Sequence, residues 1–359
     1  KQKPLTLKDA SSETLVKTLS NDNMFWRLHA QRLLVEKQDP AIIEKLARQF
    51  KDALDGGKHP AVIHALWTMH LLDMPTRGEG STDFDLVTKL TILSSKHAAP
   101  EIRRNAVQIM SQDVRDAFRD VLGNHILDMT SDPNGQVRLA VYLALADLNS
   151  FDKAGQLIND LNNADVLRDR WLLDAATAAA AKNDWIVLGE AIRNSKLDWS
   201  DPAARERLAL IAGHVARGRI TPDLIGSLIA DLPKAKPIVA TTIIGGLDKG
   251  WPRGVTAKLN DDQELALASL LKIVPATEQS TVISLARKLG SEKLDKYAAE
   301  IATSLLTTVQ DDKADEAARV TAAKQLIEFR KTDSASAAAL LEMLSPRIAP
   351  QLAQGLIEA

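Results

Sequence analysis

The chain has 359 residues, no cysteine and a formal net charge of −2, from 45 basic and 47 acidic side chains. Without cysteine, disulfides, thiolate metal ligands and a thiol nucleophile are excluded. Acids and bases are interspersed, which disfavours nucleic acid as a partner, because binding to phosphates draws on a concentrated basic patch. No apolar run approaches the ~20 residues needed to cross a bilayer, so no transmembrane segment is expected.

The length allows two or three ordinary domains or one repetitive array with a long, thin core. Aromatic residues are 4% and charged residues 26% of the chain, and alanine and leucine dominate. This balance is typical of chains made mostly of helix. We therefore favour a single array over residues 1–359.

The stretch Asn21–Glu36, NDNMFWRLHAQRLLVE, shows the expected repeating unit. Trp26, Ala30, Leu33 and Leu34 fall at positions i, i+4, i+7 and i+8, which places them on one stripe of an α-helix. The small Ala30 lets a neighbouring helix approach while the indole of Trp26 fills the space beside it. The pattern predicts a helix that stacks on others.

Proline marks the expected starts of many helices, because its missing N–H costs nothing in the first helical turn. The residue before it is often a capping residue such as aspartate. No segment shows the alternating pattern of a strand. The start signals are Asp39-Pro40, His59-Pro60, Ala99-Pro100, Asp132-Pro133, Asp201-Pro202, Thr221-Pro222, Lys236-Pro237 and Ala349-Pro350.

The expected helices come in pairs, and the second helices of these pairs can be aligned with one another. In each, the aligned residue stands three positions before a small or apolar residue. The period is about 35 to 40 residues, as in two-helix solenoid repeats. The sequence thus predicts an all-α, HEAT/armadillo-like superhelix of about nine or ten antiparallel helix pairs. The aligned pairs are Arg27 with Ala30, Val62 with Ala65, Arg103 with Ala106, Arg138 with Val141, Arg168 with Trp171, Arg205 with Leu208, and Arg319 with Ala322.

Two Pro/Gly-rich stretches break this rhythm and are expected to be exposed insertions. They are Asp73–Asp83, DMPTRGEGSTD, and Gly245–Gly254, GGLDKGWPRG. Either could be a contact site, because insertions in a solenoid gather on one edge. A solvated connector is the commoner outcome for such a loop.

No motif indicates catalysis or a cofactor. The seven histidines include no HExxH pair, and the glycines form no GxGxxG or Walker loop. The acidic run at 311–316 lacks EF-hand spacing, and no GxSxG nucleophile turn is present. We expect no catalytic residue, no metal, no cofactor and no enzymatic activity in this segment.

The residues singled out for contact with a partner are Arg27, Arg103, Arg138, Arg168, Trp199 and Trp251. The arginines, with Arg205, would form a ladder of guanidinium groups on the inner face of a solenoid. The structural alternative, which we favour, is that each bonds to carbonyls or an acid of an adjacent repeat. The two tryptophans lie near helix ends, where we expect partial exposure. Trp26, Trp67, Trp171, Trp185 and Tyr142 are expected to pack in the core.

The chain resembles the HEAT-like repeat region of large membrane-bound dehydrogenase proteins from planctomycete and Bacteroidetes-type bacteria. The most specific string is FWRLHAQRLLVE at Phe25–Glu36. Further strings are IHALWTMHLL at Ile63–Leu72, APEIRRNAVQIM at Ala99–Met110, GGLDKGW at Gly245–Trp251, and LLEMLSPRIAPQLAQGLIEA at Leu340–Ala359. The chain departs from the family in having neither the propeller nor the CxxCH haem-attachment motif.

The resemblance implies an excised middle module of a larger protein, placed in the periplasm or outside the cell. Its role would be a spacer and docking surface between a sugar-dehydrogenase-like propeller and a c-type cytochrome module. The expected partner is therefore protein, either adjacent domains or a separate chain.

Two alternatives come from a different class. The first is an enzyme on a HEAT-like scaffold, such as a DNA glycosylase, with Trp26, Trp67 and Trp171 lining a concave face. The scattered acids argue against it. The second is a lyase-like or chaperone-like protein that acts on a prosthetic group, for which no residue can be named.

Overall fold

The computed structural model describes residues 6–73, 86–112, 119–148, 151, 153–218, 222–275, 278–291, 293–329, 334–344 and 348–358. Every regular element in these ranges is a helix, and the helices form ten consecutive pairs. The chain divides into two compact units. Unit 1 comprises residues 1–160 and 164–183, and unit 2 comprises residues 161–163 and 184–359. The predicted all-α solenoid class is confirmed.

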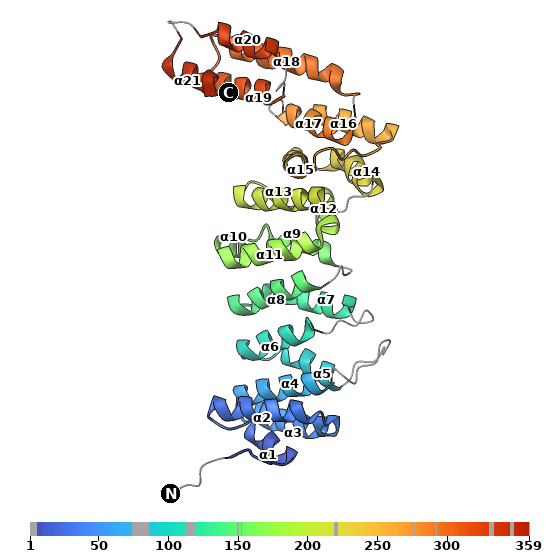
Figure 1. Cartoon of the computed structure of the whole chain (residues 1–359), viewed down its shortest axis with the longest axis vertical. Coiled ribbons are helices and arrows are strands. Elements are labelled where there is room, and N and C mark those ends of the chain that lie inside the picture. Colours follow the sequence, from blue (N-terminus) through green and yellow to red (C-terminus); the bar gives the residue numbers. More distant parts are fainter. Residues whose placement is uncertain are drawn as a thin grey trace. The chain divides into compact units, whose positions relative to one another are not determined.

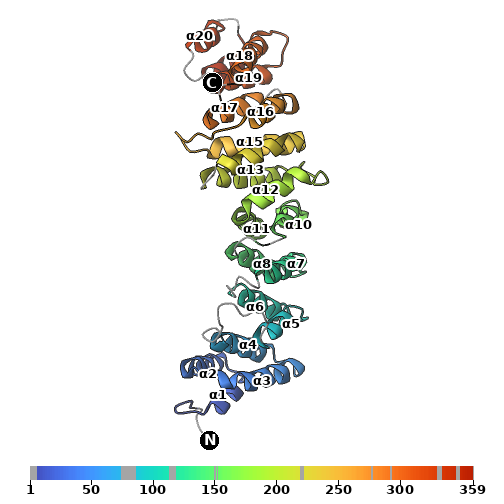
Figure 2. The same ribbon diagram turned by 90° about the vertical axis from the view of Figure 1, so that its right-hand side faces the viewer.

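Unit 1 consists of two layers of helices that follow one another in chain order (Figures 1 and 2). The second helices of the pairs, α2, α4, α6, α8 and α11, contact each other in sequence. Each first helix packs against its own partner. The bounds are α1 (Ser12–Thr18), α2 (Met24–Lys37), α3 (Ile43–Asp55), α4 (His59–Asp73), α5 (Leu86–Ser94), α6 (Pro100–Met110), α7 (Arg119–Asp128), α8 (Gly135–Asp147), α9 (Leu157–Asp160), α10 (Ala164–Arg168) and α11 (Arg170–Lys182).

Unit 2 repeats this arrangement. Its second helices α13, α15, α17, α19 and α21 contact each other in sequence, and α12, α14 and α16 form the other layer. The bounds are α12 (Asp184–Arg193), α13 (Pro202–Arg217), α14 (Pro222–Asp231), α15 (Pro237–Gly250), α16 (Asp261–Ile273), α17 (Gln279–Leu289), α18 (Asp295–Gln310), α19 (Glu316–Phe329), α20 (Ser334–Glu342) and α21 (Pro350–Glu358).

The small positions of the aligned second helices are buried as predicted. Ala30, Ala65 and Ala106 are fully buried, and Trp26 packs against the same core from a half-buried position. A methyl group at these positions lets adjacent second helices come close, and larger side chains fill the space between them. This packing of a small residue against a neighbouring helix therefore recurs from α2 to α6.

The proline signals lie at or near helix starts. Pro100, Pro202, Pro237 and Pro350 are the first residues of their helices, whereas α4 begins one residue before Pro60 and Pro40 opens a 3-10 turn before α3. Asp39 and Asp201 accept hydrogen bonds from the backbone N–H of the second residue after them, as N-caps do. At Asp132-Pro133, however, the cap is Asn134, and α8 begins at Gly135. Asp132 also accepts from the N–H of the second residue after it, Asn134, and its carboxylate additionally binds Arg103.

The insertion expected at Gly245–Gly254 is wrong for its first half, because Gly245–Gly250 continue α15. Gly246 and Gly250 lie against the backbone of α13. A Cβ at Gly246 would stand 2.3 Å from the Ala209 carbonyl oxygen, and one at Gly250 would stand 2.5 Å from the Gly213 oxygen. These glycines serve close helix packing, and the connector starts only at Trp251. Of the other insertion, Asp73 ends α4, and 74–83 lie outside the described residues.

Candidate functional site

Arginines near the start of several second helices share one local contact. The Nη1 atom of each arginine donates to the backbone carbonyl six residues earlier, in the turn that leads into the helix. In all but Arg138 it also donates to the carbonyl five residues earlier. These carbonyls have no helical partner, so the arginine fixes the angle at which the chain enters the helix. The bonds are Arg27 to Asn21 (2.7 Å) and Asp22 (2.8 Å), Arg103 to His97 (2.9 Å) and Ala98 (2.7 Å), Arg138 to Asp132 (2.8 Å), and Arg205 to Trp199 (2.6 Å) and Ser200 (2.6 Å).

Arg103 makes a second contact, which links two repeats. Its Nε donates to Asp132 Oδ2 at 2.7 Å and its Nη2 donates to Oδ1 at 2.8 Å, so the carboxylate is held by two parallel bonds. The two side chains are 12% and 6% exposed. Burial opposes ionisation of Asp132, but the bonds from Arg103 and the Asn134 N–H outweigh it and lower the pKa of this carboxyl. The Asp132 hydrogen bond correspondingly raises the pKa of Arg103.

Of these bonds, those from Arg103 to Asp132 reach an adjacent repeat, as the structural interpretation predicted. Arg27, Arg138 and Arg205 instead bond to carbonyls of the turn before their own helix. Arg168 does not belong to this row. It is the exposed last residue of α10. In α2, α8 and α13, the residue four places after the N-cap is an arginine. The N-cap of α11 is Asp169, and the residue four places after it is the buried Leu173. The predicted register was shifted by five residues at this helix.

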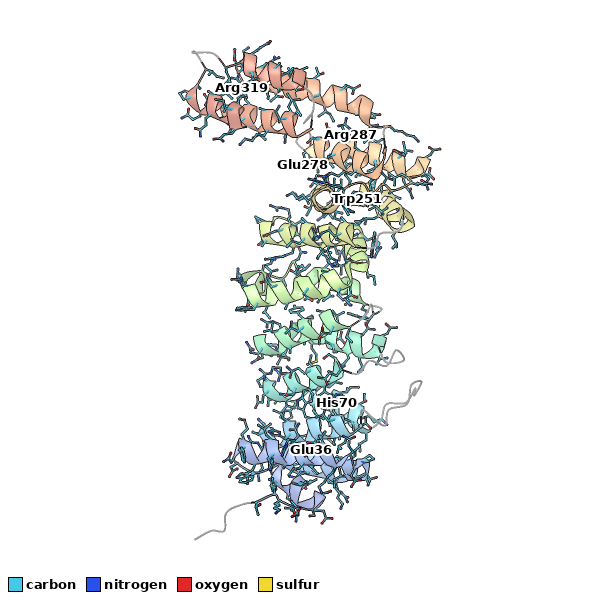
Figure 3. The ribbon with its side chains drawn as sticks, viewed as in Figure 1. Glu36, His70, Trp251, Glu278, Arg287 and Arg319 are labelled. Atoms are coloured by element: carbon cyan, nitrogen blue, oxygen red, sulfur yellow. The ribbon has the colours of Figure 1, made fainter. Side chains whose placement is uncertain are left out.

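The exposure predicted for Trp199 and Trp251 is wrong, because the two side chains are only 3% and 7% exposed. Trp251 lies among the helices of unit 2 (Figure 3), and its Nε1 donates to the Val255 carbonyl at 2.8 Å. Trp171, expected in the core, is 70% exposed. Asp169 accepts from the backbone N–H of Trp171, which places this residue in the first turn of α11. That capping aspartate is the signal that could have revealed its position.

The second helices of unit 1 carry several large apolar side chains on their exposed side. Phe25 and Leu28 on α2, Leu143 on α8 and Trp171 on α11 are each at least half exposed. Phe25 is further fixed by ring contacts with Trp26 and His29, at 5.0 Å and 6.0 Å between centroids. Leu143 and Trp171 lie on the adjacent helices α8 and α11, whereas Phe25 and Leu28 lie on α2, so these side chains form two separate sets.

A cleft of about 380 Å³ lies in unit 2 over α18 and α19, lined by Ile301, Leu305, two glutamines and smaller residues. A second cleft, of about 310 Å³, lies on the second helices α4, α6 and α8 of unit 1. We call the latter the α6 cleft. Its described lining residues are Trp67, Gln108, Ser111, Gln112, Ala140, Leu143, Ala144 and Asp147.

The α6 cleft arises because α6 has 11 residues, whereas α4 has 15 and α8 has 13. The side chains that line the cleft are fixed by contacts within the chain. Trp67 Nε1 donates to Asn105 Oδ1 at 2.8 Å, and His70 Nε2 lies 3.1 Å from Gln112 Oε1. The Trp67 and His70 rings meet edge to face at 5.8 Å. A preorganised surface loses less entropy on binding than a mobile one.

The chemistry of the α6 cleft suits an extended peptide. Trp67 and Leu143 offer apolar contact on opposite sides, and the exposed Gln108 offers both a donor and an acceptor to a peptide backbone. Asp147 is the one charged side chain among the described lining residues, and it would favour a basic group at that end. Within the described residues, no group of three or more histidine, cysteine, aspartate or glutamate side chains could hold a metal ion. The described helices include none that is long and apolar enough to span a bilayer.

No protein-family model matches the chain, and no curated protein matches it. Among solved structures, a C-terminal fragment of the cohesin loader SCC2 from Chaetomium thermophilum is similar over 98% of this chain, with a TM-score of 0.34 and 13% sequence identity. The chain spans about a third of that fragment, since the match covers 31% of it. The helices and their pairing establish a helical-repeat module.

Proposed function

We propose that this helical-repeat module is a protein-docking scaffold and that the α6 cleft takes an extended segment of its partner. The observation that carries the proposal is the pairing of the fixed Trp67 indole with the 52%-exposed Leu143, with the Gln108 amide between them. Large aromatic and aliphatic side chains in a preformed depression are the usual anchors of protein interfaces. The favoured segment carries two apolar side chains and a basic one.

The resemblance to the membrane-bound dehydrogenase proteins supports a finer proposal. In such a protein the module would be a spacer and docking surface between a sugar-dehydrogenase-like propeller and a c-type cytochrome module, in the periplasm or outside the cell. Neither the propeller nor the haem motif lies in the 359 residues. The reading frame around this segment tests the placement: flanking propeller and CxxCH sequences support it, and a free-standing gene without them contradicts it.

The cleft itself can be tested with peptides selected from a random display library against the full chain. We expect the selected peptides to share two apolar residues and a lysine or arginine. Their affinity, measured by fluorescence polarisation, should be in the micromolar range or weaker, as for small interfaces (Kd of about 1 to 100 μM). Leu143→Asp should weaken binding by about tenfold or more, because it places a charge on an apolar anchor.

The matched control is Leu210→Asp in α13. Leu143 and Leu210 each lie nine residues after the N-cap of their helix, and both are exposed. The control substitution should leave peptide affinity unchanged. Equal weakening by the two substitutions, or selected peptides that bind the Leu143→Asp variant normally, would refute the α6 cleft as the docking site.

A further inference from the structure

The guanidinium group of Arg27 is only partly satisfied. Its Nη1 donates to the carbonyls of Asn21 and Asp22. Its Nε is buried and has no hydrogen-bond partner in the part of the chain that the structure describes. A buried donor without an acceptor destabilises the folded chain relative to a paired one. A ligand oxygen that accepts a hydrogen bond from Arg27 Nε would therefore remove this unfavourable contribution.

Arg103 shows what the Nε and Nη2 atoms of an arginine at this position bind elsewhere in the chain. It occupies the same position in its helix and makes the same Nη1 contacts to the preceding turn. Its Nε and Nη2 hold the Asp132 carboxylate with two bonds of 2.7 Å and 2.8 Å. Asp132 stands three residues before the first residue of the next second helix, α8. The corresponding position before α4 is Gly56, which has no side chain to offer.

A cleft gives access to Arg27. It measures about 280 Å³ and is lined by Ser20, Asn21, Asp22, Arg27, Lys58, Pro60 and Ala61. Lys58 and the first turn of α4 line this cleft together with Arg27, so a second basic residue and the positive end of a helix dipole lie beside the guanidinium group. Asp22 is the single acid of this lining. The balance of charge favours an anion.

From these features we infer that Arg27 and Lys58 form a carboxylate-binding site on unit 1. The ligand class follows from Arg103, whose fork-shaped edge matches the two oxygens of a planar carboxylate. The carboxylate can belong to an acidic side chain of a docked protein or to a small free acid. The site is separate from the α6 cleft, and neither proposal depends on the other.

The test follows arginine Nε–Hε signals in NMR spectra of the nitrogen-15-labelled full chain during a titration with sodium acetate. Sodium chloride keeps the ionic strength constant. The Arg27 signal should move and saturate, with half-saturation at about 1 to 100 mM, because the Nε is shielded and the cleft wall must adjust. The Arg103 signal should stay in place, because Asp132 already fills its edge. It is the internal control.

Two sources of the carboxylate are distinguished with the capped peptide Ac-Ala-Glu-Ala-NH2. A shift of Arg27 by both acetate and this peptide assigns the site to acidic side chains of a partner as well as to free acids. A shift by acetate alone assigns it to free acids. No shift by either, or an equal shift of Arg27 and Arg103, overturns the site. A stronger response to inorganic phosphate than to acetate overturns the assignment to carboxylates.

Variants at Lys58 keep the test independent of the structural role of Arg27. Lys58→Glu places an acid inside the cleft and should raise the half-saturating acetate concentration by about tenfold or more. Lys58→Gln, which removes the charge only, should raise it less. Both are followed on the Arg27 Nε–Hε signal and on the backbone amide of Ala61. Unchanged acetate binding in Lys58→Glu contradicts the site.

Discussion

Replacing Gly246 with alanine tests the close packing of α13 and α15. Alanine is the better helix former by about 1 kcal/mol, so local propensity alone favours the substitution. The structure predicts the opposite sign. The new Cβ would lie 2.3 Å from the Ala209 carbonyl oxygen and 2.8 Å from the Ala212 Cβ. The first of these atoms is backbone and cannot rotate away.

The magnitude follows from the displacement that the extra methyl group requires. Relieving the contact needs α15 to move by about 1 Å, and a gap of that size forfeits up to half of the dispersion energy of the facing atoms. Overpacking in a rigid environment costs up to about 3 kcal/mol. Subtracting the gain in helix propensity leaves a net destabilisation of about 2 kcal/mol. For a unit of this size, that lowers Tm by about 4 to 8 °C.

The adjacent residue provides the control. A Cβ at Gly245 meets nothing within 4 Å, so Gly245→Ala should stabilise the chain by about 0.5 to 1 kcal/mol. Both variants are compared with the parent chain by thermal and urea unfolding followed by circular dichroism. Midpoints are the appropriate measure, because repeat proteins need not unfold in one step. A Gly246→Ala variant as stable as the parent would refute the packing argument.

Three further predictions concern unit 1. Asp132→Asn should destabilise the chain by about 3 kcal/mol in urea unfolding, because it breaks a buried ion pair, and the loss should be smaller in an Arg103→Gln background. The pKa of Asp132 is lowered in the folded state, so the stability from this pair is fully present above the usual carboxyl pKa and is lost as the pH falls below about 4. Asp132→Asn should therefore flatten the acid limb of a stability profile, and an unchanged limb would contradict the assignment. Trp171→Ala should change stability by less than about 0.5 kcal/mol, because the indole is 70% exposed, and a larger loss would show that it packs.

Features that depend on local chemistry were predictable from the sequence. The caps at Asp39 and Asp201 and the buried small positions Ala30 and Ala65 rest on spacing within one helix, and the structure confirms them. The helices of unit 2 were harder to predict, because Gly246 is a helix-weakening residue whose place in α15 depends on its neighbour α13. Propensity contains no information about that neighbour.

The candidate contact residues show the same division. Helical periodicity places Trp171 on one face of a helix, and Trp199 is expected only to lie near a helix end, but neither pattern says which side chains the next repeat covers. Trp199 is buried in the turn before α13, and Trp171 is exposed in the first turn of α11. The α6 cleft could not be read from the sequence at all, since it depends on where α6 ends relative to α4 and α8. Only the packed structure decides such questions.

The arginine row suggests how one repeat can supply both cohesion and recognition. Each clamping arginine uses Nη1 on the turn before its own helix, so this bond is local and independent of the next repeat. The Nε atom is left for a second contact, and an acidic residue of the next repeat can accept its hydrogen bond, as Asp132 does for Arg103. Where the matching position is Gly56, the chain does not fill it. A single residue in the following turn thus determines whether the arginine ties two repeats together or remains available to a carboxylate from outside.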